Sequence, residues 1–244
     1  MRHRPAPDDE PAPDAGTAVE QRATGDGFAT LYSPRYGQTY HSRHGAGTEA
    51  RHVFLRASGV ADRLAAGHPT RVLEVGFGTG LNFLTTAQAA LDAGTPLTFV
   101  SLERDVLPAA TLDALGHGMH FDTPLSADLV AWRRGLPDVV PPGRYTFDSG
   151  AATLVLVVGD APDAPLPEHC DAVYLDAFSP DANPELWTVP FLRRLHAALR
   201  PGGRLTTYSA KGSARRALAA AGFEVEKRPG PPGKREMTVA TRPA

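Results

Sequence analysis

The sequence predicts an α/β domain of the Rossmann-like type, with a seven-stranded, mostly parallel sheet that carries helices on both faces. Short apolar, β-branched runs alternate with segments in which apolar residues recur at helical spacing, as in βαβ units. The first strong strand signal, Arg71 to Val75, breaks into glycines at alternate positions just before a helical pattern begins. Nucleotide-binding βαβ units open in this way. A length of 244 residues suffices for one such domain with a sizeable core.

Composition excludes several classes of protein. No apolar run reaches the roughly 18 residues of a membrane span, and no charged-then-apolar leader precedes the domain. The single cysteine, Cys170, cannot form an internal disulfide, and the histidines lack the spacing of metal ligands. We therefore expect a cytoplasmic protein without a metal ion. The sequence carries no signal of its oligomeric state.

The chain divides into three predicted parts. Residues 1–26 are rich in proline, alanine and acids with almost nothing apolar to bury, so we expect them to be disordered. Residues 27–66 predict a β-hairpin around Pro34 to Gly37 and then a helix that Ser58 and Gly59 divide. This segment is either a substrate platform or a simple cover for the sheet edge. Residues 67–244 form the main domain, in which Arg144 to Val158 are expected to form an inserted hairpin that leads into the third sheet strand.

Charge is unevenly distributed although the formal net charge is only −2. Residues 35–56 hold seven arginine and histidine side chains against the single acid Glu49, and residues 204–235 hold eight lysines and arginines against two acids. Such segments are either ordinary solvated surface or a surface for backbone phosphates. Both interpretations remain open from the sequence.

The glycine turn distinguishes between two cofactors. Counting from Gly76, the third glycine of a dinucleotide fingerprint would fall on Leu81 and is absent. A carboxylate, Glu74, instead precedes the turn, where it would repel a pyrophosphate and attract the amino and sulfonium groups of S-adenosyl-L-methionine. A second acid, Glu103, ends the next apolar run, at the interval where an acid binds ribose hydroxyls. These residues favour a methyltransferase. The alternative interpretation is a structural glycine turn with an acid nearby by chance. The predicted cofactor-binding residues of this turn and strand are Glu74, Gly76, Phe77, Gly78, Thr79, Gly80, Asn82 and Glu103.

Two further strand ends carry candidate site residues. The apolar run Ala152 to Val158 ends in Gly159 and Asp160, and this acid would either accept a hydrogen bond from an adenine amino group or cap a helix. The run Asp171 to Leu175 is followed by Asp176-Ala177-Phe178-Ser179-Pro180. Enzymes that methylate amines place a polar residue, a proline turn and an aromatic at this position. Asp176 is therefore the candidate catalytic residue and Phe178 the candidate stacking face, unless Asp176 only caps the strand. A helix is expected from Asn183, with Asn183 as its cap and Pro184 at its first position.

With these residues in view, the chain resembles the MnmD family, the methyltransferase domain of the bifunctional tRNA-modifying MnmC proteins and its stand-alone relatives. The resemblance runs from about Gly27 to Ala240. Its motifs are Leu31 to Gly37 with Tyr40 to Ser42, Glu49 to Leu55, Glu74 to Leu84, Tyr174 to Pro180, Asn183 to Trp187, and Gly233 to Met237. The stretch from Asp176 to Trp187 and the ending Lys234 to Met237 are the most specific, whereas the glycine turn is shared by many methyltransferases.

The resemblance implies S-adenosyl-L-methionine-dependent methylation of the aminomethyl nitrogen of 5-aminomethyl-2-thiouridine at the tRNA wobble position. The partner would be the tRNA anticodon stem-loop, and the residues expected to bind the substrate are Tyr40, His41, Arg51, Phe178, Trp187, Lys234 and Arg235. The chain departs from the family at Ala177, where glycine is common, and we expect it to lack the FAD-dependent half of MnmC because nothing follows Ala244.

Two functions of other kinds remain open. The chain could be a class I methyltransferase that acts on another amine, either a small molecule or another nucleobase. It could also be a non-catalytic module that binds adenosylmethionine or RNA. The intact glycine turn together with Asp176 disfavours the non-catalytic module.

Overall fold

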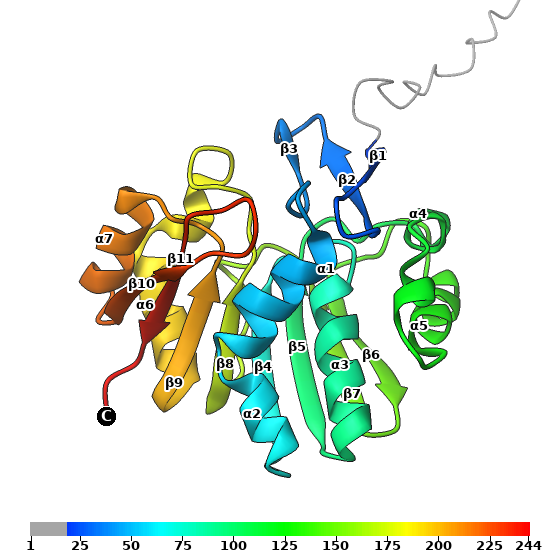
Figure 1. Cartoon of the computed structure of the whole chain (residues 1–244). Coiled ribbons are helices and arrows are strands. Elements are labelled where there is room, and N and C mark those ends of the chain that lie inside the picture. Colours follow the sequence, from blue (N-terminus) through cyan, green and yellow to red (C-terminus); the bar gives the residue numbers. More distant parts are fainter. Residues whose placement is uncertain (1–18) are drawn as a thin grey trace, which may run out of the picture.

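The structure, a computed structural model, describes residues 19–244. An eight-stranded sheet runs through the centre of the molecule (Figure 1). From one edge to the other its strands are β10 (Glu224–Pro229), β11 (Glu236–Thr241), β9 (Leu199–Thr207), β8 (Cys170–Leu175), β4 (Thr70–Val75), β5 (Leu97–Glu103), β7 (Ala152–Val158) and β6 (Gly143–Ser149). The five strands from β9 to β7 run parallel to one another, whereas β11 is antiparallel to both β9 and β10, and β6 is antiparallel to β7.

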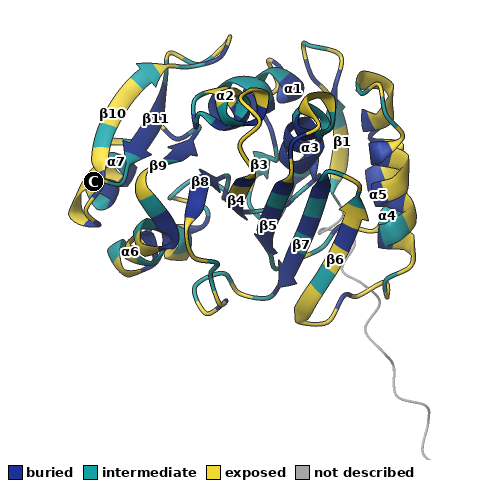
Figure 2. Ribbon diagram, turned by 90° about the horizontal axis from the view of Figure 1, so that it is seen from below, coloured by how far each residue is buried: buried dark blue, intermediate teal, exposed yellow. Residues whose placement is uncertain are grey.

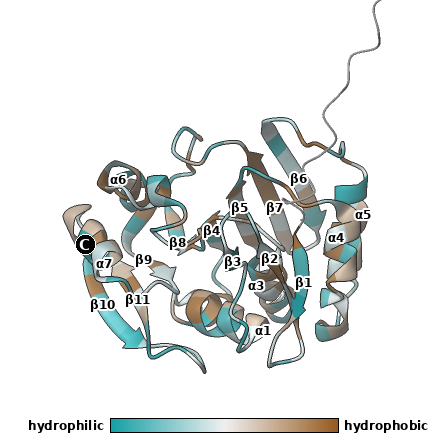
Figure 3. Cartoon of the chain, turned by 90° about the horizontal axis from the view of Figure 1, so that it is seen from above, coloured by the Kyte–Doolittle hydropathy of each residue, from teal (hydrophilic) through white to brown (hydrophobic). Residues whose placement is uncertain are grey.

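This architecture confirms the predicted fold class, with the addition of one strand. The segment read as an inserted hairpin supplies β6, which pairs with β7 at the sheet edge, so the sheet has eight strands. Burial follows position in the sheet: β8 is buried along its whole length, whereas the edge strands β6 and β10 are largely exposed (Figure 2). Hydropathy shows the same trend, with β5 and β7 apolar and β10 polar (Figure 3). Near-continuous apolar runs are expected of parallel strands covered on both faces.

Helices cover both faces and make two apolar layers. One layer packs α3 (Leu81–Ala93), α2 (Val60–Ala65), α5 (Leu125–Arg134) and the π-helical segment η1 (Ala50–Arg56) against the sheet. The other layer holds α6 (Val189–Ala198) and α7 (Gly212–Ala220). Two short helices, α1 (Ala46–Glu49) and α4 (Ala109–Ala114), and the 3-10 turns η2 (His117–His120) and η3 (Pro184–Trp187) complete the set. Successive side chains of a strand point to opposite faces, so Leu73 enters the second layer and Val72 the first.

A separate small sheet lies above the carboxyl ends of the parallel strands (Figure 1). It consists of β1 (Glu20–Ala23), β2 (Ala29–Ser33) and β3 (Gln38–Thr39). The last two are the predicted hairpin. The prediction that disorder extends to residue 26 is wrong at its end, because β1 pairs with β2 from Glu20 to Ala23. The sequence of β1 lacks an alternating apolar pattern, and the strand is held by its backbone pairing with β2. The rest of the predicted disordered segment, residues 1–18, lies outside the described residues.

Two predicted helices are each divided in the structure. The helix after residue 48 ends before Gly59, whose φ of +85° is accessible to glycine, and α2 follows, as the sequence indicated. The helix expected from Asn183 is instead η3 followed by α6, with Thr188 extended between them. Pro190 in the first turn of α6 has no backbone N–H to continue the preceding turn.

Within residues 19–244, no helix combines the length and apolarity needed to cross a lipid bilayer.

Candidate functional site

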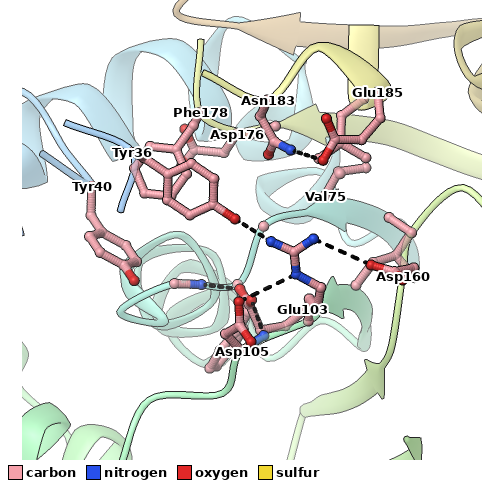
Figure 4. A pocket seen from close by; sticks show the side chains of 18 of the residues that line it. Tyr36, Tyr40, Val75, Glu103, Asp105, Asp160, Asp176, Phe178, Asn183 and Glu185 are labelled. Atoms are coloured by element: carbon pink, nitrogen blue, oxygen red, sulfur yellow. Dashed lines mark hydrogen bonds and ion pairs between the residues drawn. The ribbon is translucent and has the colours of Figure 1, made fainter. Parts of the chain in front are cut away.

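A cleft with an empty volume of about 870 Å³ opens at the carboxyl ends of β4, β5, β7 and β8 (Figure 4). Open α/β sheets bind ligands at this edge. The wall comes from segments far apart in the sequence: Tyr36, Tyr40, His41, Val75, Gly76, Phe77, Gly78, Leu102, Glu103, Arg104, Asp105, Gly159, Asp160, Ala161, Pro162, Asp176, Ala177, Phe178, Asn183, Glu185, Leu186 and Tyr208.

The glycine turn after β4 is shaped by close backbone approach. Gly76 has a φ of +94°, and a Cβ there would lie 2.9 Å from the carbonyl oxygen of Asp176. Gly78 has a φ of +51°, and a Cβ there would lie 2.9 Å from the ring of Tyr40. Side chains at these two positions would be strained and would push apart the elements that form the cleft.

Glu103 joins the glycine turn to the end of β5. Its carboxylate accepts hydrogen bonds from the backbone N–H of Gly78, at 3.0 Å, and of Asp105, at 2.8 Å. Burial raises the pKa of Glu103 above its usual value, although both hydrogen bonds oppose the shift. The side chain lines the cleft, as the sequence predicted.

Glu74, which the sequence predicted to bind the cofactor, does not line the cleft. Its side chain is fully buried and accepts hydrogen bonds from the hydroxyl of Ser101, at 2.6 Å, and the amide of Asn82, at 3.0 Å. Alternation along β4 turns it under α3, away from the strand end. Burial raises the pKa of Glu74 to about 8.

Asp176 follows β8 directly and faces the cleft (Figure 4). Its Oδ2 accepts a hydrogen bond from the amide of Asn82 at 2.8 Å. Its Oδ1 is buried and has no hydrogen-bond partner among residues 19–244. Burial, and then the nearby carboxyl groups of Glu49 and Glu74, raise the pKa of Asp176 well above its usual value. A buried acceptor without a partner in a cleft is a candidate for contact with a ligand.

Aromatic side chains form one wall of the cleft. Phe178 stacks on Tyr36 with ring centroids 4.2 Å apart and meets the edge of Tyr40 at 5.2 Å. Trp187 is not in this wall: it is buried, and its indole N–H donates to the carbonyl oxygen of Phe178 at 2.9 Å. Trp187, which the resemblance implied as a substrate contact, therefore supports the Phe178 turn from outside the cleft wall.

A second group of polar residues lies beside Asp176. His41 is buried, and its Nε2 is 2.7 Å from the hydroxyl of Thr79. Burial and the charge of Lys234 lower the pKa of His41 to about 4, so its ring is neutral at physiological pH. Lys234 forms an ion pair with the buried Glu49, and its Nζ lies 4.3 Å from the ring centroid of Tyr208.

The two basic segments of the sequence meet in the structure. A Cβ on Gly233 would lie 2.3 Å from the ring of His44, and His52 contacts the carbonyl oxygen of Pro229 at 3.0 Å. Several cations in these segments are already paired with acids: Arg35, Lys211, Arg215, Arg228 and Lys234. Arg43 and Arg235 are exposed and form no ion pair within residues 19–244. Arg51 lies over the ring of Phe28, 5.6 Å from its centroid.

The structure thus brings together one part of the predicted site. The predicted residues in the cleft wall are Tyr40, His41, Gly76, Phe77, Gly78, Glu103, Gly159, Asp160, Asp176 and Phe178. Outside the wall are Arg51, Glu74, Thr79, Gly80, Asn82, Trp187, Lys234 and Arg235.

Several polar and aromatic wall residues were not predicted from the sequence, among them Tyr36, Arg104, Asn183, Glu185 and Tyr208. Tyr208 follows β9 at the same sheet edge as Asp176, so the rule about strand ends could have found it. Asn183 was read only as a helix cap, but its side-chain amide donates to Glu185 at the cleft. Arg104 pairs with the predicted Asp160 at 3.5 Å.

The order of the strands, the antiparallel β11, the glycine turn after β4 and the acid that ends β5 together define a class I methyltransferase fold and site. The sequence model of a family described as S-adenosyl-L-methionine-dependent methyltransferase matches residues 135–243. Residues 135–243 are thus similar to this family, and the chain is similar to part of the MnmC proteins.

Two curated relatives are called tRNA 5-methylaminomethyl-2-thiouridine biosynthesis bifunctional protein MnmC. The one from Cupriavidus metallidurans is 43% identical over 220 residues, covering 86% of this chain and 32% of the relative. The one from Paracidovorax citrulli is 44% identical over 221 residues, covering 86% of this chain and 34% of the relative. The chain therefore spans about a third of the length of these proteins.

Solved structures show the same fold. The crystal structure of MnmC2 from Aquifex aeolicus superposes with a TM-score of 0.76 at 28% identity, covering 94% of this chain and 72% of that one. A spermidine synthase from Thermotoga maritima superposes with a TM-score of 0.52 at 15% identity, over 92% of this chain and 72% of that one, which is a likeness of fold alone.

Proposed function

We propose that the chain binds S-adenosyl-L-methionine in the cleft and transfers its methyl group to the amino nitrogen of 5-aminomethyl-2-thiouridine at the tRNA wobble position. The observation that carries this proposal is the position of Asp176 in the cleft wall beside the glycine turn, with a buried Oδ1 that has no hydrogen-bond partner among residues 19–244. An N–H of a substrate amine or ammonium group could donate a hydrogen bond to this oxygen. The names of the MnmC relatives support the choice of tRNA as the carrier of the amine.

The cleft suits a cationic cofactor better than a pyrophosphate. Arg104 is the one arginine in its wall, against five carboxyl groups, those of Glu103, Asp105, Asp160, Asp176 and Glu185. In the proposed complex Glu103 accepts hydrogen bonds from the ribose, Asp160 accepts one from the adenine amino group, and the glycine turn leaves room for the rest of the molecule. When bound, the cofactor supplies an electrophilic methyl group on a sulfonium. The negative cleft stabilises that positive charge.

In the proposed reaction the protein mainly aligns the two reactants and provides a group that accepts a proton from the amine. An aliphatic amine enters largely as the ammonium ion, so it must lose a proton before its lone pair can attack. Asp176 is placed to accept that proton, and alignment of the two reactants supplies much of the remaining rate. The rings of Tyr36, Tyr40 and Phe178 offer an apolar wall for an unstacked base. The anticodon loop is single-stranded, so extruding its base costs less than in a duplex.

Glu103→Ala should weaken the binding of S-adenosyl-L-methionine by about 1–3 kcal/mol, the scale of lost hydrogen bonds to a charged group. Titration calorimetry measures this directly, with Glu224→Ala on the exposed edge strand β10 as the control. The unaltered protein should show no binding of NAD. Tight NAD binding, or an unchanged affinity for S-adenosyl-L-methionine in Glu103→Ala, would contradict the assigned cofactor site.

Binding of tRNA should weaken steeply as salt rises, because phosphate contacts release counterions. Arg43→Glu and Arg235→Glu should each lower tRNA affinity several-fold and leave cofactor affinity unchanged. Arg144→Glu, an exposed change on the opposite sheet edge, is the matched control. An affinity that does not depend on salt, or equal losses in Arg144→Glu, would show that Arg43 and Arg235 are ordinary surface.

The choice of acceptor is tested with cofactor that carries a radioactive methyl group. Transfer to tRNA that bears the 5-aminomethyl group should greatly exceed transfer to the same tRNA without it, and to a polyamine. Preferred transfer to the polyamine would favour the alternative of a small-molecule amine methyltransferase. Cofactor binding with no transfer to any of the three acceptors would favour a non-catalytic module.

A further inference from the structure

One amide side chain joins the carboxyl group of Asp176, in the cleft wall, to the fully buried carboxyl group of Glu74. Asn82 is the second residue of α3 and is 3% exposed. Its Nδ2 donates to Oε1 of Glu74 at 3.0 Å and to Oδ2 of Asp176 at 2.8 Å. A side-chain amide nitrogen has two hydrogens, so both of its donors are used. Because Asn82 does not line the cleft, these contacts give it a role other than direct contact with a ligand.

The bridge fixes the orientation of the Asp176 carboxyl group. Oδ2 is turned toward α3 by the amide, so Oδ1 is left as the oxygen without a partner among the described residues. Glu74 cannot swing away, because its second oxygen accepts from Ser101 at 2.6 Å. Asn82 is thus anchored through β4 on one side and holds the end of β8 on the other.

Charged and titratable groups face Asp176 from several elements. The carboxyl groups of Glu49 in α1 and Glu74 in β4 raise the pKa of Asp176, whereas Lys234 of the β10–β11 loop and the Asn82 hydrogen bond lower it. Tyr208, at the end of β9, also lies within electrostatic reach and is un-ionised at physiological pH because burial raises its pKa. Asn82 is the only one of these groups that contacts the Asp176 carboxyl by a hydrogen bond within residues 19–244.

We propose that Asn82 is a positioning residue for methyl transfer: it holds Asp176 so that Oδ1 receives the proton of the substrate ammonium, and it stabilises the carboxylate that can accept that proton. This inference rests on the proposed function of Asp176. In the step, an N–H bond of the ammonium breaks and its proton forms an O–H bond on Oδ1. The freed lone pair then forms the N–C bond, the C–S bond breaks with its electron pair going to sulfur, and Asp176 later releases its proton to solvent.

The test uses Asn82→Ala, which removes both hydrogen bonds, and Asn82→Asp, which keeps the size but replaces the donor. Thr85→Val is the matched control, because Thr85 lies buried on the same helix and its hydroxyl has no partner among residues 19–244. Single-turnover methyl transfer to tRNA is measured against pH at saturating cofactor. In parallel, carbon-13 NMR follows the titration of the Asp176 carboxyl group, assigned by its absence in Asp176→Asn.

We expect Asn82→Ala to transfer methyl at least about 10-fold more slowly at neutral pH. The acid limb of its pH–rate profile should move up by about one to two pH units, which corresponds to the loss of one charge-assisted hydrogen bond. The carbon-13 titration should move by the same amount, and Asn82→Asp should move further. Cofactor affinity should stay within about 2-fold, and Thr85→Val should match the unaltered protein. The pKa of Glu74, about 8, leaves that group mostly neutral at pH 7, so its response to the change adds little.

Two results would overturn the inference. One is an unchanged acid limb and an unchanged carbon-13 titration in both Asn82 variants. The other is a loss of cofactor affinity that accounts for the whole loss of rate, which would make Asn82 a cofactor-binding residue. If the unaltered protein transfers no methyl to tRNA but the carbon-13 titration still shifts, the proposed function fails and the support that Asn82 gives to the Asp176 carboxylate stands.

Discussion

Asp176→Ala should bind S-adenosyl-L-methionine nearly normally and yet transfer methyl at least about 10²-fold more slowly, the scale of general-base catalysis. The physical reason is that the variant removes the carboxyl group whose buried Oδ1 has no hydrogen-bond partner in the described part of the chain, and leaves the Glu103 region untouched. Calorimetry measures the binding, and single-turnover methyl transfer measures the rate. Asp181→Asn, an exposed change in the same loop, is the control.

Asp176→Asn makes the same test sharper, because it keeps size and hydrogen bonding but cannot accept the proton. Asp176 must be ionised to act, and its pKa lies well above the usual value, so the rate should fall as pH falls through that raised pKa. Full activity of Asp176→Asn across neutral pH would rule out proton acceptance by this residue. Solvent or Tyr40 would then be examined as the acceptor, but His41 would not be a strong base because its pKa is lowered to about 4.

Lys234→Met should lower the free energy of unfolding by about 3 kcal/mol, near the lower end of the range for breaking a buried ion pair. Glu49 is only 2% exposed, so loss of Lys234 leaves its carboxylate buried without a counter-charge. The lower end applies because the Lys234 side chain is 27% exposed and water can partly replace it. Chemical denaturation measures the effect, with Arg235→Met next to it in the sequence as the control.

The double variant Lys234→Met/Glu49→Gln should recover most of that stability, since it removes the isolated charge. The amide that replaces the carboxylate keeps an oxygen able to accept from the backbone N–H of Ser42, which lies 3.0 Å from the Glu49 carboxylate. A Lys234→Met protein as stable as the unaltered one would mean that the ion pair contributes nothing. A double variant no better than the single one would mean that Lys234 acts by packing on Tyr208 alone.

The sequence predicted the sheet, the glycine turn and the strand ends because these depend on local patterns. Gly76 and Gly78 have positive φ values and lie so close to neighbouring residues that a Cβ would clash, so both positions favour glycine. The spacing of the glycines in the sequence is therefore enough to predict the turn. Asp176 and Glu103 could be assigned to one edge because parallel strands end together. The strand β1 had no such signal, since it is a polar edge strand held by pairing with β2.

The roles of individual side chains could not be predicted as well, because the sequence does not show which way each side chain points in the folded protein. Glu74 is two residues before the turn, yet alternation places it under α3, where Asn82 and Ser101 donate to it. Lys234 lies in a basic segment but pairs with Glu49, which is 185 positions away. Long-range contacts of this kind follow from packing, so the sequence could identify the segment and not the partner.

The measurement that tests the central claim most directly is mass analysis of nucleosides from tRNA incubated with the protein and cofactor that carries a deuterated methyl group. The tRNA should come from a source in which the wobble uridine stops at the 5-aminomethyl-2-thio stage. The account predicts that this nucleoside disappears and that 5-methylaminomethyl-2-thiouridine appears with the deuterated methyl group, while the reaction with Asp176→Asn leaves the starting nucleoside in place. Label in a different nucleoside, or no label in the tRNA while the cofactor is bound, would contradict it.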